Sequence, residues 1–200
     1  MSADRPKYYD NRSDFWKRAF AQGLGYDVYL QSTEPDKAQR WRVMGDQIPA
    51  LTEEQSDRLR GHGREMKVLV LSGAWCGDCV RQGPMFERIA AACGARVELR
   101  LIDRDANPEI RDEMRILGAA RVPAAVFLSE DYFEIGRFGD RLLTVYRKKA
   151  AREIGPACAT GIVAPPPEEL AAELGEWVDV FERMLLMLRL APMLRERYGD

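Results

Sequence analysis

Two cysteines stand two residues apart in the segment Ala-Trp-Cys-Gly-Asp-Cys, where they are Cys76 and Cys79. An apolar run precedes them and a helical pattern follows, so they open a helix and can close a small disulfide ring. There the first sulfur faces free backbone N–H groups and the positive end of the helix, which stabilise its thiolate. Because the thiolate is the nucleophile in disulfide exchange, Cys76 would attack a substrate disulfide and Cys79 would resolve the mixed disulfide.

The elements that must position these cysteines alternate between strand and helix patterns. Residues 66–72 form a short aliphatic run typical of a buried strand, and apolar residues recur at helical spacing over 79–92. The further elements are a strand at 97–103, a helix at 108–117 that Gly118 ends, and strands at 122–129 and 133–138. This order predicts an α/β fold, in which helices flank a central mixed β-sheet with one parallel crossover and an antiparallel edge.

With these elements in order, the middle of the chain resembles the thioredoxin superfamily. Trp75, Cys76, Gly77 and Cys79 stand where that family has its Trp-Cys-Gly-Pro-Cys motif. The other matching positions are Pro84, at the family's helix kink, Val122 and Pro123, at its cis-proline beside the disulfide, and Gly118 and Gly139. The matches share order and spacing over about 67–148, and such a set is far more specific than a lone pair of cysteines. The flanking segments do not match typical thioredoxins.

The resemblance implies a thioredoxin-like fold and thiol–disulfide oxidoreduction on protein disulfides, with reduction favoured. Cys76 would be the nucleophile and Cys79 the resolving thiol, and a cis Pro123 would offer a backbone edge to an extended substrate. The residues assigned to the substrate groove and to tuning are Trp75, Gly77, Asp78, Val122, Pro123 and Gly139. Trp75 could equally be a packing residue. No metal or organic cofactor is implied, and the electrons would come from a thiol or another reductase.

Two residues depart from the family pattern. Typical thioredoxins bury an aspartate six residues before the first cysteine, where it assists proton transfer at the resolving thiol, whereas this chain has Val70. Asp78 replaces the proline between the cysteines, and its carboxylate disfavours the Cys76 thiolate by Coulomb repulsion. Both changes should alter rate and potential while keeping the exchange chemistry.

Two other interpretations of the cysteines stay open. Cys76 and Cys79 could be half of a zinc site completed by Cys93 and Cys158, although the chain has no second C-x-x-C. The fold could also be a non-catalytic interaction module whose extensions cover the motif. Cys93 is most simply a buried small hydrophobe, and Cys158 a bystander in a loop. His62 is the only histidine and has no evident partner, so histidine-dependent catalysis is not expected.

The flanking segments predict helical additions to the central domain. We expect an N-terminal helical extension (1–65), a thioredoxin-like domain (66–150), and a C-terminal loop and helix packed on the core (151–200). Ser13 is expected to cap a first helix, and Thr52 to Gln55 has the spacing of a capping box. An apolar stripe that should dock the last helix on the core consists of Leu170, Leu174, Trp177, Phe181, Leu185 and Leu188.

The composition is that of an ordinary globular protein. Of 200 residues, 46% are apolar and 31% are charged, and the formal net charge is −2. Basic residues are interspersed with acidic ones, so no nucleic-acid partner is expected. No secretory signal or membrane-spanning run is recognised, and we expect a cytoplasmic protein whose thiols are kept reduced. The oligomeric state is not specified by the sequence.

Overall fold

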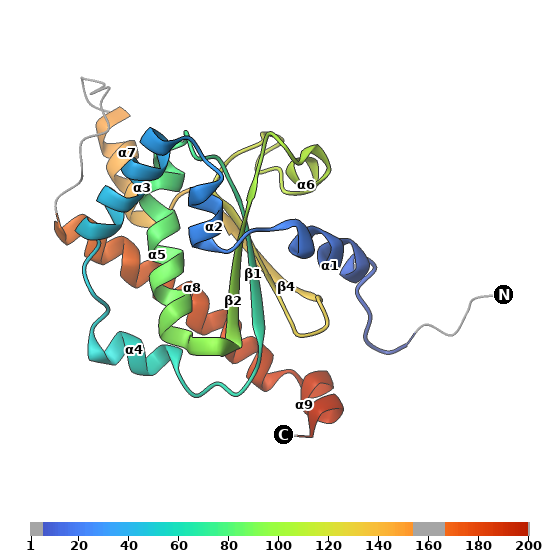
Figure 1. The fold of residues 1–200 in the computed structure, drawn as a ribbon. Helices are drawn as coiled ribbons and strands as arrows, with labels where there is room; N and C mark the ends of the chain where they lie inside the picture. Colours follow the sequence, from blue (N-terminus) through green and yellow to red (C-terminus); the bar gives the residue numbers. More distant parts are fainter. Residues whose placement is uncertain (1–5, 154–166, 200) are drawn as a thin grey trace.

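A mixed four-stranded sheet lies at the centre of the molecule, in the strand order β2-β1-β3-β4 (Figure 1). The structure is a computed structural model that describes residues 6–153 and 167–199. The strands are β1 (Met66–Ser72), β2 (Val97–Asp103), β3 (Ala124–Leu128) and β4 (Glu134–Gly139). β1 pairs with β2 in parallel and with β3 antiparallel, and β3 pairs antiparallel with β4. The predicted parallel crossover and antiparallel edge are therefore confirmed.

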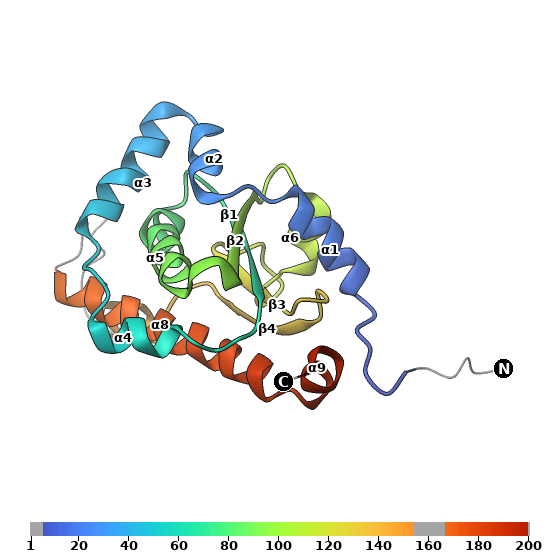
Figure 2. The same ribbon diagram turned by 60° about the horizontal axis from the view of Figure 1, so that its bottom comes forward.

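Helices cover both faces of this sheet. Within the described residues they are α1 (Ser13–Gln22), α2 (Tyr26–Gln31), α3 (Pro35–Gln47), α4 (Glu53–Leu59), α5 (Gly77–Cys93), α6 (Pro108–Glu113), α7 (Leu143–Glu153), α8 (Pro167–Leu190) and α9 (Pro192–Tyr198), with a 3-10 turn at Gly94–Arg96. Figures 1 and 2 show α5 and α8 on one side of the sheet, and α1 and α6 on the other. Because both faces are covered, β1 is almost continuously apolar and buried.

Aromatic rings join α8 to the sheet and to α5. The indole of Trp177 lies edge-on to Phe86 of α5, with ring centroids 4.4 Å apart, and Phe181 lies edge-on to Phe127 of β3 at 5.2 Å. All six residues of the predicted apolar stripe on α8 are buried. Through this stripe the helix α8 packs on the core.

The helix α3 packs closely across α5. The Trp41 side chain is buried, and its Nε1–H donates a hydrogen bond to the Ala74 carbonyl at 3.2 Å, beside the cysteines. The indole of Trp41 occupies the space above Gly83, where an added Cβ would lie 2.0 Å from the ring. Glycine at this position of α5 is therefore required by the close approach of α3.

The segment before α2 reaches the outer edge of the sheet. Leu24 exchanges two backbone hydrogen bonds with Leu101 of β2, both of 2.8 Å. A Cβ on the preceding Gly23 would lie 2.8 Å from the Cβ of Arg100, so the glycine permits this approach.

Two local predictions need correction. Ser13 does not cap α1, because the helix already includes Ser13, and Arg12 is at the N-cap without a side-chain hydrogen bond to the helix. The helix predicted over 108–117 ends at Glu113, since Leu117 and Gly118 have positive φ in a tight turn. By contrast, Thr52 and Gln55 form the predicted capping box of α4.

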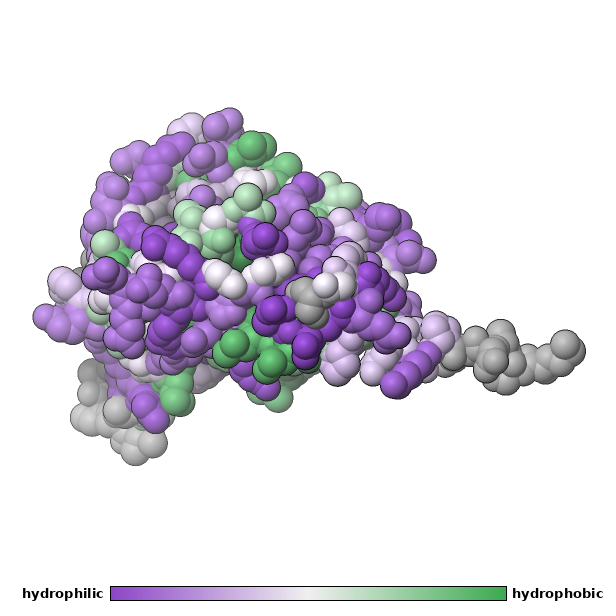
Figure 3. Space-filling view, turned by 90° about the horizontal axis from the view of Figure 1, so that it is seen from below, coloured by the Kyte–Doolittle hydropathy of each residue, from purple (hydrophilic) through white to green (hydrophobic). Residues whose placement is uncertain are grey.

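The exposed surface is mostly hydrophilic on the face seen from below. Figure 3 shows hydrophobic residues there in small groups among hydrophilic ones. No helix in the described ranges is both long and apolar enough to span a bilayer. Cys158 and its loop lie outside the described residues.

The contact between α3 and α5 generates a stability prediction. Gly83→Ala should lower the free energy of unfolding by about 1–3 kcal/mol, because the new methyl group must displace the buried Trp41 ring. Gly175→Ala in α8 is the matched control, since its Cβ would lie 3.7 Å from the nearest atom, Nε2 of Gln55. That control should be neutral or stabilising by up to about 1 kcal/mol. Chemical denaturation measures the free energy of unfolding of both variants. Equal changes in Gly83→Ala and Gly175→Ala would contradict this account of the packing.

Candidate functional site

The turn between β1 and α5 presents the two cysteines. β1 ends at Ser72, and Cys76 occupies the N-cap of α5 in an extended conformation. The Cys76 N–H donates to the Gly73 carbonyl at 2.9 Å, and the Cys76 carbonyl accepts from Val80 at the same distance. Cys76 therefore stands at the positive end of the helix, and Cys79 lies one turn inside it.

The two sulfurs differ in their exposure and acidity. Cys79 is 1% exposed, Cys76 is half-buried, and both are free thiols. A hydrogen bond from the Cys79 thiol lowers the pKa of Cys76 to about 7, against the opposing effect of burial, and the backbone N–H groups of Cys79 and Asp78 add to the lowering. Burial, followed by the hydrogen bond to Cys76, raises the pKa of Cys79 well above its usual value. Of the two thiols, Cys76 is therefore the one that ionises around neutral pH.

The Val122–Pro123 peptide bond is cis, as the sequence predicted. In its protonated form, the Cys76 thiol donates a hydrogen bond to the Val122 carbonyl, with 3.5 Å between Sγ and O. Gly139 of β4 lies against the same segment, and a Cβ there would be 2.6 Å from the Pro123 carbonyl oxygen. The structure therefore brings Cys76, Val122, Pro123 and Gly139 together.

Trp75 lies at the surface beside Cys76 and is 44% exposed. The guanidinium of Arg104 stacks 4.6 Å from the centre of its ring, and its Nε1–H donates to Asp105 Oδ2 at 3.3 Å. A Cβ on Gly73 would lie 2.8 Å from the indole, so that glycine makes room for the ring. Asp103 accepts the backbone N–H groups of Asp105 and Ala106 in the turn after β2.

Charged residues that the sequence analysis missed surround Asp78. Arg141 forms an ion pair with Asp78 at 2.6 Å, and about a quarter of each side chain is exposed to solvent (23% of Arg141 and 24% of Asp78). The residue before Arg141, Asp140, is 3% exposed and accepts hydrogen bonds from Arg121, at 3.1 Å, and from the Tyr146 hydroxyl. The sequence offered one clue to these arginines, because they lie close in sequence to the family positions Val122 and Gly139. Their pairing with carboxylates distant in sequence could not be read from it.

The remaining candidates lie apart from this site. Cys93 ends α5 partly buried against the core, and burial raises its pKa to about 12. His62 was expected to have no partner, but its Nε2 lies 2.7 Å from the Arg58 carbonyl because the ring folds back on α4. Within residues 6–153 and 167–199, no group of three histidine, cysteine or acidic side chains could hold a metal ion. The fourth cysteine of the zinc interpretation, Cys158, is outside those ranges.

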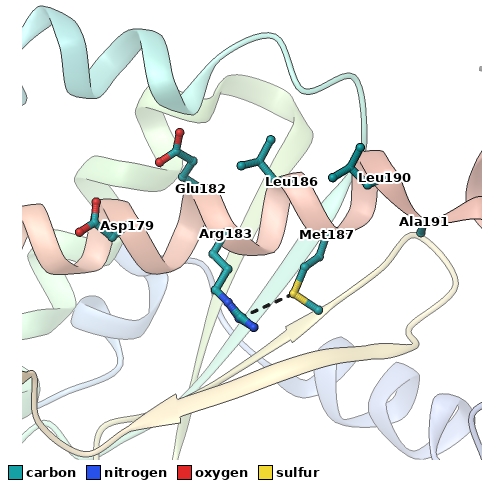
Figure 4. Close-up of a pocket in the computed structure, with 7 residues that line it drawn as sticks. All are labelled: Asp179, Glu182, Arg183, Leu186, Met187, Leu190 and Ala191. Atoms are coloured by element: carbon teal, nitrogen blue, oxygen red, sulfur yellow. Dashed lines mark hydrogen bonds between the residues drawn. The ribbon is translucent and has the colours of Figure 1, made fainter.

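A surface cavity of about 540 Å³ lies along the C-terminal half of α8 (Figure 4). Leu186 and Leu190 project to one side of the helix, and Arg183 and Met187 to the other, where Arg183 contacts the Met187 sulfur at 3.9 Å. None of the residues that line it belongs to the cysteine site, and none is a nucleophile.

Comparisons with known proteins agree with this arrangement. A family model described as thioredoxin matches residues 23–147, a range that begins before α2 and includes α3 and α4. The match is wider than the motif positions alone suggested, and the packing of α3 on α5 gives the physical reason. No curated protein was found to match the chain.

Two solved structures are similar in fold. A protein of unknown function from Pseudomonas aeruginosa has a TM-score of 0.59 and 17% identity, over 91% of this chain and 97% of that chain. The crystal structure of an HIV epitope-scaffold has a TM-score of 0.58 and 16% identity, over 92% of this chain and 98% of that chain. At these identities the likeness concerns the fold alone.

The acidity of Cys76 generates a pH prediction. Its alkylation rate should rise with pH around a midpoint of about 7, because only the thiolate reacts and its pKa is lowered to about 7. Cys79 should stay unalkylated over that range, since it is buried and its pKa is raised. Mass spectrometry of the alkylated protein identifies the reacting sulfur. A midpoint near the usual thiol value, or equal labelling of the two cysteines, would contradict the prediction.

The Asp78–Arg141 pair generates a second prediction, with changes of opposite sign. Asp78→Asn removes a carboxylate that raises the pKa of Cys76 and should lower that pKa by roughly half a unit, since the pair is near solvent. Arg141→Met leaves Asp78 unpaired and should raise the pKa of Cys76 by a similar amount. Thiolate absorbance against pH measures both variants, and shifts of the same sign would show that the pair does not tune Cys76.

Proposed function

Because the chain belongs to the thioredoxin family, we propose that it is a thiol–disulfide oxidoreductase that reduces disulfides in other proteins through Cys76 and Cys79. The family resemblance and the thioredoxin-like fold predicted from the sequence are confirmed. The observation that carries the proposal is the asymmetry of the pair, in which an accessible thiol ionises near pH 7 beside a buried thiol that stays protonated. Nucleophile and resolving thiol need these two properties.

The reaction proceeds in two exchanges. The Cys76 thiolate attacks one sulfur of the substrate disulfide, so a Cys76–substrate disulfide forms and the other substrate sulfur leaves as a thiolate. Cys79 then loses its proton and attacks Cys76, which closes the Cys76–Cys79 disulfide and releases the second substrate thiolate. The substrate gains two electrons from the protein. One of the two protons that its sulfurs take up comes from Cys79 and the other from solvent, because Cys76 reacts as a thiolate.

The surface around Cys76 suits an extended polypeptide. The Val122 carbonyl lies within reach of Cys76, and the cis Pro123 segment beside it offers backbone groups to a substrate strand. The exposed Trp75 ring, held by Arg104 and Asp105, forms a flat neighbouring surface. We assign substrate binding to these residues and tuning of Cys76 to Asp78.

The cycle needs a reductant, because it ends with the Cys76–Cys79 disulfide. A low-molecular-weight thiol or another dithiol protein would return two electrons, and a reducing cytoplasm would supply either. The half-exposed Cys76 supports exchange over a purely scaffolding role, in which the extensions would cover this sulfur.

Replacing each cysteine tests the assignment. Cys76→Ser should abolish reduction of a protein disulfide such as that of insulin, because the nucleophile is lost. Cys79→Ser should instead accumulate a mixed disulfide with the substrate, since nothing resolves it. The assays are insulin turbidity and mass spectrometry.

The matched control is Cys93→Ser, which removes a partly buried thiol at the far end of α5 and should keep full activity. Retention of activity by Cys76→Ser would overturn the proposed nucleophile, and activity absent from the unaltered protein would overturn the proposed function.

A further inference from the structure

In the second exchange Cys79 must become a thiolate before it can attack the mixed disulfide, and its surroundings disfavour this negative charge. Burial raises the pKa of Cys79, and the neighbouring Cys76 sulfur raises it further. The residue on β1 that shares a face with Ser72, two positions earlier, is Val70, which has no polar group to offer. Resolution would be slow unless another buried group stabilises the Cys79 thiolate.

Two buried hydroxyl groups lie next to this sulfur. Ser72, the last residue of β1, is 1% exposed, and Tyr29 of α2 is 2% exposed. Among the described residues, neither hydroxyl has a partner at hydrogen-bond geometry. Burying a hydroxyl without a partner costs free energy, so unpaired groups beside a reacting atom call for an explanation.

The two hydroxyls act on each other and on Cys79 electrostatically, although neither of them makes a formed hydrogen bond within the described part of the chain. Interaction with the Ser72 hydroxyl lowers the pKa of Cys79, and it also opposes the rise that burial causes in the pKa of Tyr29. The Ser72 hydroxyl therefore acts on both of the other groups. Tyr29 keeps its proton at neutral pH, because the net effect raises its pKa.

The helices of the N-terminal segment hold Tyr29 in place. Its ring packs against the indole of Trp41, with centroids 5.6 Å apart, and the Trp41 Nε1–H donates a hydrogen bond to the Ala74 carbonyl. The charged groups that act on this cluster are the Cys76 thiolate, Asp78 beside that thiolate, and Asp103 at the end of β2, which acts on Tyr29. All three are anionic. The donors available to a new negative charge at Cys79 are therefore the backbone of Gly73, which lowers the pKa of Cys79, and the buried hydroxyls.

We propose that Ser72 and Tyr29 form a buried hydroxyl pair that stabilises the Cys79 thiolate during resolution, with Ser72 donating to Cys79 and Tyr29 donating to Ser72. The inference rests on the proposed function and adds two residues to its second step. In that step the S–H bond of Cys79 breaks, its proton goes to the departing substrate sulfur, and the Cys76–Cys79 bond replaces the Cys76–substrate bond. In this proposal Ser72 donates directly to the reacting sulfur, whereas Tyr29 is a positioning residue that acts through Ser72.

The experiment follows the two exchanges separately. An aromatic disulfide that releases a coloured thiolate at each step, 5,5′-dithiobis(2-nitrobenzoate), is mixed with the reduced full-length protein in a stopped-flow instrument. A background of Cys93→Ser and Cys158→Ser removes the other thiols. The first release reports attack by Cys76, and the second reports resolution by Cys79.

Ser72→Ala should slow the second release about tenfold and leave the first unchanged, because a hydrogen bond to a charged group is lost. Tyr29→Phe should slow the second release severalfold, and the double variant should be no slower than Ser72→Ala. The pH profile of the second release should move to higher pH in all three.

Two substitutions are matched controls. Ser129→Ala removes another buried hydroxyl, and Tyr132→Phe removes the hydroxyl of a tyrosine in the turn after β3. Both should leave the two releases unchanged. An unaltered second release in Ser72→Ala, or equal slowing of both releases, would overturn the hydroxyl pair while leaving the proposed function intact. If the protein that keeps both Ser72 and Tyr29 gave no first release, the proposed function itself would be overturned, and the inference with it.

Discussion

The unequal solvation of two sulfurs one helical turn apart is the constraint on which the rest of the site depends. A buried thiolate is costly, and each unit of pKa difference corresponds to about 1.4 kcal/mol between the two protonation states. The end of α5 therefore concentrates the charge on Cys76, which has backbone N–H donors and the Cys79 thiol around it. The buried strand β1 and the helix α3 exclude water from Cys79 and maintain that difference.

The charged groups around the cysteines form a second layer. Asp78 repels the Cys76 thiolate, and Arg141 compensates much of its charge by direct pairing. Asp140 is buried and is neutralised by Arg121 and hydrogen-bonded by Tyr146. Because each carboxylate has a cationic partner, their charges near the site are largely compensated. The pairing with Arg141 thus allows an acidic residue, Asp78, at the position between the cysteines where the resemblance to thioredoxins leads one to expect proline.

Much of the fold followed from local pattern. The apolar run at 66–72 and the alternation at 97–103 predicted β1 and β2 to the residue, because side-chain burial repeats along a strand. The cis Val122–Pro123 bond followed from motif position. The early end of α6 did not, since a turn between Ile116 and Ala119, stabilised by reciprocal backbone bonds, competes with the helix. Nor did the Asp78–Arg141 pair or the approach of Tyr29 to Ser72, which depend on packing between segments distant in sequence.

The bridge between Leu24 and Leu101 has a consequence for how copies of this chain meet. An open sheet edge can recruit a strand from another molecule, and such pairing leads to aggregation. Leu24 occupies both backbone groups of Leu101 within the outer edge of β2, so an incoming strand cannot pair along the whole edge. Gly23 makes this possible by fitting closely against Arg100. The N-terminal segment thereby protects the sheet from edge-to-edge self-association on this side.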